Sequence, residues 1–372
     1  MNKIVFVSPN INKDGAEKSL IALQVYLNSK GISTLVVIPK NGLIEELLIK
    51  DNVDYIVHHF VGSVNFGRGK KLFRGIVKKY INIFSSFQLA YKLKKKGISV
   101  VAVHSNTITT DFGHYLASRL NTHHFWHIRE FGKLDFNFDF ELGMDYMAKI
   151  TKKAAKIICN SNAVKNYYSK YFETSKLVTV YNGVKPSVDV DIQKESGLFK
   201  MLLIGRLSKE KGQKEAILAC SRLLKSGRDN FLLNLYGTGK DLEYLKDLIK
   251  SLHLEEKIIL KGYSDKIEIN KYDVGLMCSP FEAFGRVTVE YMFAGLPVIG
   301  KNAGGTPEII NKDTGILYSD EDSLYKAMSL LYDNQDLRKE MGYKANERAI
   351  EVFSENKYCE NILKVYKEII EL

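Results

Sequence analysis

The sequence is poor in cysteine and has no long hydrophobic run. Its four cysteines, Cys159, Cys220, Cys278 and Cys359, have no paired spacing, which argues against a disulfide framework and against a zinc site. No stretch approaches the roughly 18 consecutive apolar residues that predict a membrane-spanning helix. The opening run, MNKIVFVSPN, is too short for a secretory signal, and no small-residue cleavage pattern follows it. We therefore expect a cytoplasmic protein whose cysteines are buried as small hydrophobic residues.

A dinucleotide-binding fingerprint is also missing. The nearest approach to GxGxxG, GTGKDL at 237–242, lacks the third glycine. Short apolar segments nevertheless alternate with amphipathic helical segments, as in α/β folds whose parallel sheets are covered on both faces. We expect strands at 3–9, 34–39, 55–60, 100–105, 123–128, 156–161, 177–181, 200–207, 231–236, 258–260 and 274–278, and helices at 14–30, 285–294 and, broken near Ser354, 320–372.

Composition bounds the class of protein. A length of 372 residues suggests two or three domains, and 45% hydrophobic with 26% charged residues is ordinary for a globular chain. The formal net charge of +11 predicts attraction to something anionic. Nucleic acid, an anionic membrane leaflet and an anionic substrate are all candidates.

Most of this charge lies in one segment. Residues 67–97 contain ten Lys or Arg and no acidic residue, so they contribute +10. A basic amphipathic helix is typical of an element that lies on an anionic membrane surface. The alternative is a solvated helix whose apolar stripe packs on the sheet of its own domain. The interleaved apolar residues are Leu72, Phe73, Ile76, Val77, Tyr80, Ile83, Phe84 and Phe87.

The strongest functional signal is the stretch from Cys278 to Glu308, CSPFEAFGRVTVEYMFAGLPVIGKNAGGTPE. It predicts a strand, a loop, a helix that begins near Gly285, a second strand and a second loop. A helix N-terminus attracts phosphate because its N–H groups are unpaired and the helix dipole is positive there. Glu282 precedes this helix. Glu290 lies roughly one to two turns along it, where a carboxylate can accept hydrogen bonds from ribose hydroxyls. The pattern favours a nucleoside diphosphate sugar, and the alternative is two glutamates exposed for solubility.

This stretch resembles the donor-site signature of the retaining glycosyltransferases of family four. IGRLSKEKG at 204–212 is similar to the GRLxxxKG motif of that family, and VYNGV at 180–184 resembles the turn that closes its first domain. The resemblance implies a GT-B fold, in which two Rossmann-like domains with parallel sheets face each other across a cleft. The domains that it implies are an acceptor-binding domain at 1–184, a linker at 185–199 and a nucleotide-sugar-binding domain at 200–352, with 353–372 crossing back onto the first domain.

The resemblance also implies roles for individual residues. Arg206 and Lys211 would clamp the donor diphosphate, Glu282 would hold hydroxyls of the donor sugar, and Glu290 would hold the ribose. His127 would touch the donor sugar or phosphate. The other implied donor-site residues are Gly15, Gly262, Tyr263, Phe284, Gly285 and Arg286, and the acceptor-side candidates are His104, Asn106 and Arg129.

At one of these places the chain departs from the family. Two glycines are usual where this sequence has Asp14 and Gly15, so only Gly15 carries over, as a point of close backbone approach. An ordinary helix start capped by Asp14 is the alternative.

The implied reaction moves a sugar from a nucleoside diphosphate sugar to a hydroxyl with retention at the anomeric carbon, with UDP favoured over GDP and no metal or other cofactor required. Asp189-Val190-Asp191 spells the DxD of metal-dependent glycosyltransferases, but it lies in the expected linker, and those enzymes have a different fold.

The basic segment favours an acceptor linked to polyprenyl diphosphate at the inner face of the cell membrane, as in surface polysaccharide synthesis. We expect a peripheral protein and no nucleic-acid partner. A soluble or protein acceptor, a nucleotide-sugar epimerase of related fold and a basic nucleic-acid-binding protein are the alternatives.

Overall fold

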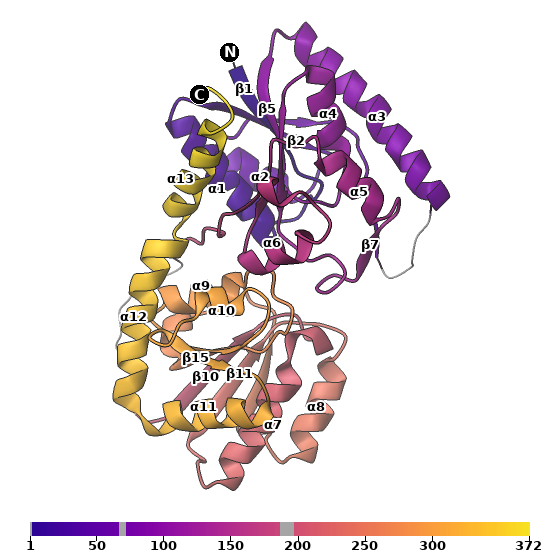
Figure 1. Ribbon diagram of the computed structural model, residues 1–372. Coiled ribbons are helices and arrows are strands. Elements are labelled where there is room, and N and C mark those ends of the chain that lie inside the picture. The colour runs from indigo at the N-terminus through magenta and orange to yellow at the C-terminus, as the bar shows by residue number, and fades with distance from the viewer. Residues whose placement is uncertain (1, 67–71, 187–196) are drawn as a thin grey trace. The chain divides into compact units, whose positions relative to one another are not determined.

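The computed structural model describes residues 2–66, 72–186 and 197–372. It contains two compact units, of which one comprises Met1–Gly183 with Glu355–Leu372 and the other Val184–Ser354. Each unit is built on a parallel sheet (Figure 1). The triplet Asp189–Asp191, like most of the expected linker, lies outside the described residues.

The sheet of the first unit has its strands in the order β3-β2-β1-β5-β6-β8-β9, all parallel. This order reverses between β1 and β5, as in Rossmann sheets. The strands are β1 (Asn2–Val7), β2 (Ser33–Ile38), β3 (Tyr55–Val57), β5 (Ser99–Ser105), β6 (His123–Ile128), β8 (Lys156–Cys159) and β9 (Leu177–Thr179). A separate antiparallel pair consists of β4 (Val64–Phe66) and β7 (Phe138–Phe140).

Helices cover both faces of this sheet, which explains why its strands are almost wholly apolar. On one face α1 and α13 pack over Phe6 and Phe125, and on the other α3 and α4 pack over Val5 and Val103 (Figure 1). The helices are α1 (Gly15–Ser29), α2 (Ile44–Lys50), α3 (Leu72–Lys95), α4 (Phe112–Leu120), α5 (Met144–Thr151), α6 (Asn162–Tyr168) and α13 (Glu355–Lys367). Because α13 supplies Tyr358 and Tyr366 to this core, it belongs to the first unit although the second unit precedes it in the chain.

The second unit repeats the architecture, with its strands in the parallel order β12-β11-β10-β13-β14-β15. Its order reverses between β10 and β13. The strands are β10 (Phe199–Ile204), β11 (Phe231–Tyr236), β12 (Ile258–Gly262), β13 (Val274–Met277), β14 (Val298–Lys301) and β15 (Gly315–Tyr318). The helices are α7 (Gln213–Lys225), α8 (Leu242–Ser251), α9 (Arg286–Phe293), α10 (Thr306–Ile309), α11 (Glu321–Asp333) and α12 (Gln335–Phe353).

The structure tests the expectations for the cysteines and for the C-terminal helix. All four cysteines are free and buried, as expected. The expected helix at 320–372 is divided into α11, α12 and α13, so the expected break near Ser354 is confirmed and a second break, at Asn334, was missed. Asn334 has non-helical backbone angles, and its side-chain amide donates to the carbonyl of Leu330 at 2.8 Å, a local hydrogen bond that competes with helix continuation.

Candidate functional site

The expected donor-site residues of the second unit gather where its strand order reverses. The strands β10 and β13 are neighbours in the sheet, and ligands of such sheets bind at the reversal because the loops that follow the two strands diverge there. The loop after β10 supplies Arg206 and Lys211. The loop after β13 supplies Glu282 and leads into α9.

Lys211 and Glu282 form an ion pair between Nζ and Oε1 that joins these two loops. Lys211 ends the short 3₁₀ helix η2 (Lys209–Lys211), and Glu282 precedes α9. The side chains are 31% and 16% exposed, so the pair is partly shielded yet still open to a ligand. Arg206 is exposed on the same connection, and its carbonyl accepts a hydrogen bond from Gln213 at 3.0 Å. Two cations beside one carboxylate can bind a diphosphate and a sugar hydroxyl together.

Glycines allow these loops to approach each other backbone to backbone. A Cβ atom on Gly212 would lie 2.7 Å from the Cβ of Cys278, and one on Gly304 would lie 2.5 Å from the carbonyl oxygen of Glu282. Gly305 N–H donates to that same carbonyl at 2.7 Å. The backbone of Glu282 is therefore held from the loop after β14, which explains why a Gly-Gly pair follows that strand.

The loop after β11 packs against the loop after β10 in the same way. Gly237 N–H donates to the carbonyl of Gly262 at 2.8 Å, and Leu207 N–H donates to the carbonyl of Thr238 at 3.0 Å. Gly262 has a positive φ of 70°, and the next residue, Tyr263, is 78% exposed. Gly262 and Tyr263 thus lie at the end of β12, which is hydrogen-bonded to the loop after β11, and that loop is in turn hydrogen-bonded to the loop after β10.

The helix α9 begins at the second loop with Gly285 as its N-cap, in the left-handed conformation with φ 91°. Arg286 and Glu290 are half-buried, and Glu290 lies one turn into the helix. The side chain of Phe284 lies elsewhere than expected, because it is 3% exposed and packs edge-on against Phe353. It is part of the core, so only its backbone is placed to meet a ligand.

In the first unit, Arg129 joins several expected residues at the carboxyl ends of β5 and β6. Its guanidinium donates to the side chain of Asn106 at 3.1 Å, to the hydroxyl of Tyr358 at 3.0 Å and to Nδ1 of His127 at 3.3 Å. Because Nδ1 accepts, the proton of the neutral His127 ring lies on Nε2. Burial lowers the pKa of His127 well below its ordinary value. Nε2 has no hydrogen-bond partner among the described residues, so it is a buried donor that a ligand or water oxygen could satisfy.

The two other expected residues of this unit are His104 and Gly15. His104 is fully buried, and its Nδ1 is 2.7 Å from the hydroxyl of Tyr366. Burial lowers the pKa of His104 to about 3, which keeps the ring neutral. His104 is therefore enclosed in the core, and its Nε2, like that of His127, has no hydrogen-bond partner among the described residues. Gly15 is the first residue of α1, and Asp14 precedes it without making a side-chain cap bond.

Two buried carboxyls, one after β1 and one after β6, were given no role by the sequence analysis. Glu17 is fully buried in the first turn of α1, and burial raises its pKa to about 7. Glu130 accepts from the N–H groups of Ile108 and Arg129 at 3.1 and 3.0 Å, and burial raises its pKa to about 8. Perturbed carboxyls of this kind are frequent at functional sites. The available signal was their place in the first turn of α1, the helix that follows β1, and two residues after the end of β6.

The raised pKa of Glu17 predicts that the free energy of unfolding depends on pH. The variant Glu17→Gln should lack the part of this dependence that Glu17 causes. Because the pKa of Glu17 is higher in the folded protein than its ordinary value of 4.5, its stabilising contribution is complete below about pH 4.5 and is lost as the pH rises through 7. The stability of the native protein relative to the variant should fall by about 2 kcal/mol between pH 5.5 and 8.

Thermal or urea unfolding of both proteins across this pH range measures the effect. The glutamine oxygen can still accept from Asn10, which is 3.0 Å from the Glu17 carboxylate, so the variant should fold normally. If the two proteins differed in unfolding free energy by the same amount at all pH values, the raised pKa of Glu17 would be contradicted.

Within 2–66, 72–186 and 197–372, no group of three or more His, Cys, Asp or Glu is arranged to hold a metal ion. Among the helices of those same ranges, none combines the length and the apolar character that crossing a membrane requires.

Comparison with known proteins gives consistent matches over most of the chain. The family model for group 1 glycosyl transferases matches residues 185–348, and the model for glycosyltransferase family 4 matches residues 13–188. An uncharacterized glycosyltransferase of Methanocaldococcus jannaschii is 27% identical over 251 residues, which are 62% of this chain and 63% of that protein. N-acetyl-alpha-D-glucosaminyl L-malate synthase of Bacillus anthracis is 28% identical over 207 residues, which are 52% of this chain and 54% of that protein. The match thus spans less than two thirds of the length of either relative.

A similar solved structure is that of Anabaena Alr3699/HepE in complex with UDP. It superimposes with a TM-score of 0.79 at 19% identity, covering 99% of this chain and 100% of that one. At this identity the likeness establishes a shared fold.

Proposed function

Because the chain belongs to the group 1 glycosyltransferases of family four, we propose that it transfers a sugar from a nucleoside diphosphate sugar to a hydroxyl group. The acceptor that we propose is a lipid-linked glycan in surface polysaccharide synthesis. The proposed transfer retains the configuration of the anomeric carbon and needs no metal ion. The observation that carries the donor part of this proposal is the Lys211–Glu282 ion pair at the strand reversal of the second unit. A cation for phosphate and a carboxylate for sugar hydroxyls are adjacent there.

The proposed reaction breaks the bond between the anomeric carbon and the diphosphate oxygen, and the acceptor oxygen bonds to that carbon from the same face. The diphosphate leaves with its negative charge, which Arg206, Lys211 and the N-terminus of α9 would stabilise. The acceptor proton passes to the leaving phosphate oxygen, so this route needs no second carboxylate of the glycosidase type. Glu282 would hold hydroxyls of the donor sugar, and Glu290 would hold the ribose.

UDP is the nucleotide that we propose first, because it is the ligand of the similar Anabaena structure. The lipid-linked acceptor is proposed from the charge of the chain, since ten of its cations lie in residues 67–97 without an acidic neighbour in that segment. Such a segment attracts the anionic surface on which a polyprenyl diphosphate is embedded.

A donor screen followed by product analysis tests the proposal. Thermal shift with UDP- and GDP-sugars should identify one nucleotide, and NMR of the product should give the same anomeric configuration as the donor, with rates unchanged by EDTA. An inverted product would overturn retention, and activity that EDTA abolishes and Mn²⁺ restores would overturn metal independence. Release of an epimerised nucleotide sugar without transfer would favour an epimerase. Equal rates with a glycan acceptor that lacks the lipid would overturn the proposed acceptor.

A further inference from the structure

The longest helix of the first unit, α3, has its polar side facing inward. Its buried residues are Gly75, Asn82, Ser85, Ser86, Leu89, Ala90 and Leu93, of which the first four are small or polar. A surface helix of a globular protein normally has an apolar inner face. Over its first four turns α3 therefore has the reverse of the usual pattern.

Specific polar contacts fasten this inner face to the unit. The side chain of Asn82 donates to the carbonyl of Val61 at 3.0 Å and to Asp111 at 2.6 Å, and it accepts from the N–H of Val61 at 2.9 Å. Arg74 and Lys78 both form ion pairs with the buried Glu141. The unit thus holds the first four turns of α3 by polar contacts, whereas Leu89 and Leu93 near the end of the helix pack in the core.

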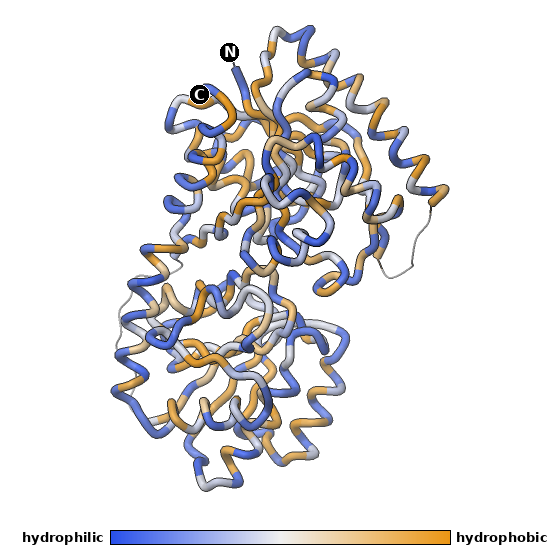
Figure 2. The backbone as a smooth tube through the Cα atoms, viewed as in Figure 1, coloured by the Kyte–Doolittle hydropathy of each residue, from blue (hydrophilic) through white to orange (hydrophobic). Residues whose placement is uncertain are grey.

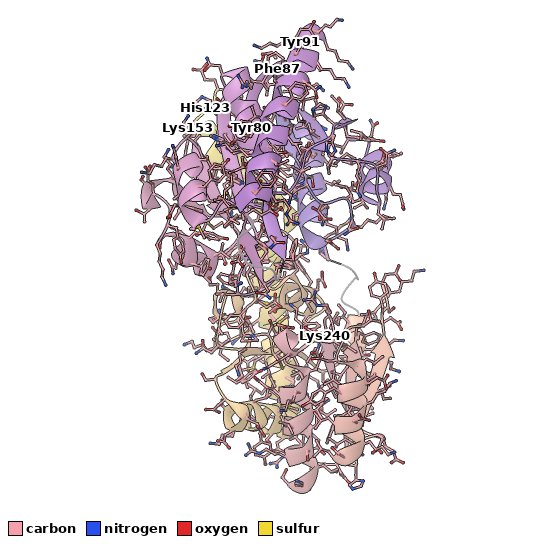
Figure 3. The ribbon with its side chains drawn as sticks, turned by 90° about the vertical axis from the view of Figure 1, so that its right-hand side faces the viewer. Tyr80, Phe87, Tyr91, His123, Lys153 and Lys240 are labelled. Carbon is pink, nitrogen blue, oxygen red and sulfur yellow. The ribbon has the colours of Figure 1, made fainter. Side chains whose placement is uncertain are left out.

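The aromatic residues of α3 lie on its outward face. Phe73, Tyr80, Phe84, Phe87 and Tyr91 are 82%, 64%, 62%, 56% and 63% exposed. Their spacing of three, four or seven residues aligns them along one side of the helix. Apolar residues recur along α3 in Figure 2, and Tyr80, Phe87 and Tyr91 follow one another along the helix in Figure 3. Contiguous exposed apolar surface of this kind marks an interaction site.

The charge of α3 identifies the chemistry of the partner. No acidic residue occurs within the helix, and Lys92, Lys94 and Lys95 are exposed in its last turn. Aromatic residues flanked by lysines suit the boundary between lipid headgroups and acyl chains. We propose that the outward face of α3 docks on an anionic lipid bilayer, with the helix axis in the plane of the membrane and the aromatic stripe inserted at the headgroup level.

A second copy of the chain fits this face less well. Two α3 helices packed face to face would bring the cations of both helices together, and neither helix offers an acidic side chain to pair with them. A bilayer containing anionic lipid covers the aromatic residues and neutralises the lysines at the same time. The docking does not depend on the transfer chemistry proposed above.

A tryptophan reporter tests the insertion directly. The chain has one tryptophan, Trp126, which is fully buried and therefore supplies a constant background. In Phe84→Trp, vesicles of phosphatidylglycerol and phosphatidylethanolamine should shift the emission to the blue, and brominated lipids should quench it. In Tyr244→Trp, a matched control at a 49% exposed aromatic of the second unit, vesicles should change nothing. A blue shift that depends on protein concentration without vesicles would overturn the proposal in favour of a second copy.

Vesicle flotation measures the contribution of the stripe and of the charge. The triple variant Phe73→Ser, Phe84→Ser, Phe87→Ser should lower the partition coefficient by at least about tenfold, because three exposed aromatic rings no longer enter the membrane. Its melting temperature and its hydrolysis of a soluble donor should be unchanged, which separates docking from catalysis. Failure of the native protein to bind anionic vesicles at low salt, or equal binding by the triple variant, would overturn the proposal.

Discussion

Replacement of Glu282, Lys211 or Arg206 by alanine is expected to lower kcat/KM for sugar transfer by roughly 10²–10³-fold in each case. The reason is that, in the proposed mechanism, each side chain would stabilise charge or orient hydroxyls during cleavage of the bond to the diphosphate, and single groups of this kind contribute factors of this size. Steady-state kinetics with the donor identified by the screen would measure the loss. Removal of the cations should lower kcat more than it raises KM, since the diphosphate carries its additional charge only as it leaves.

Lys209→Ala is the matched control, because Lys209 is an exposed cation on the same short 3₁₀ helix as Lys211. It should keep near-normal activity. Melting temperatures of all four variants should stay close to that of the native protein, which would exclude unfolding as the cause of any loss. Near-normal rates in Glu282→Ala, Lys211→Ala and Arg206→Ala together would contradict the assignment of this site.

The second large effect is expected for Gly212→Ala. Gly212 has a φ of 71°, and an added Cβ would lie 2.7 Å from the Cβ of Cys278 and overlap its carbonyl oxygen. The loops after β10 and β13 would have to separate. We expect a loss of about 3–4 kcal/mol of unfolding free energy, at the upper end of what single substitutions cost, together with a loss of activity because Lys211 and Glu282 move apart. Urea unfolding of the variant measures the first effect.

Gly227→Ala separates the cost of a left-handed backbone conformation from the cost of the steric overlap with Cys278. Gly227 also has a positive φ, 83°, but no atom lies within 4 Å of the Cβ position. Its substitution should cost only about 1–2 kcal/mol, the strain of the left-handed conformation for a residue with a side chain, and should leave activity intact. Equal losses in the two variants would mean that the close approach at Cys278 has no energetic importance.

Local patterns predicted most of the fold and the loops of the candidate donor site. Most of the sheet strands are largely apolar segments, and the glycines at 212, 285 and 304 stand where backbone geometry admits no other residue without strain. Both kinds of signal depend on near neighbours in the chain. The short pair β4 and β7 was missed because its strands have three residues each and pair across more than 70 positions, so neither has a pattern of its own.

Burial and orientation were harder to predict, since they depend on distant parts of the chain. Glu17 lies in an amphipathic helix, where a glutamate normally indicates the solvent side, but here Ser8 and Asn10 from the preceding loop enclose it. For α3, the composition left open whether the apolar stripe packs on the sheet or faces away. The hydrogen bonds of Asn82, the ion pairs to Glu141 and the burial of Leu89 and Leu93 together determine which side is inside.

The helix α13 has a consequence for how the protein is made. During translation the strands and helices of the first unit leave the ribosome well before α13, which follows the whole second unit and contributes Tyr358, Ile362 and Tyr366 to the first core. Domains generally fold as units during synthesis. Here the first unit lacks α13, and the apolar face that α13 covers stays exposed, until the second unit has been synthesised. Chaperone protection of that nascent face would therefore matter most while the second unit is still being translated.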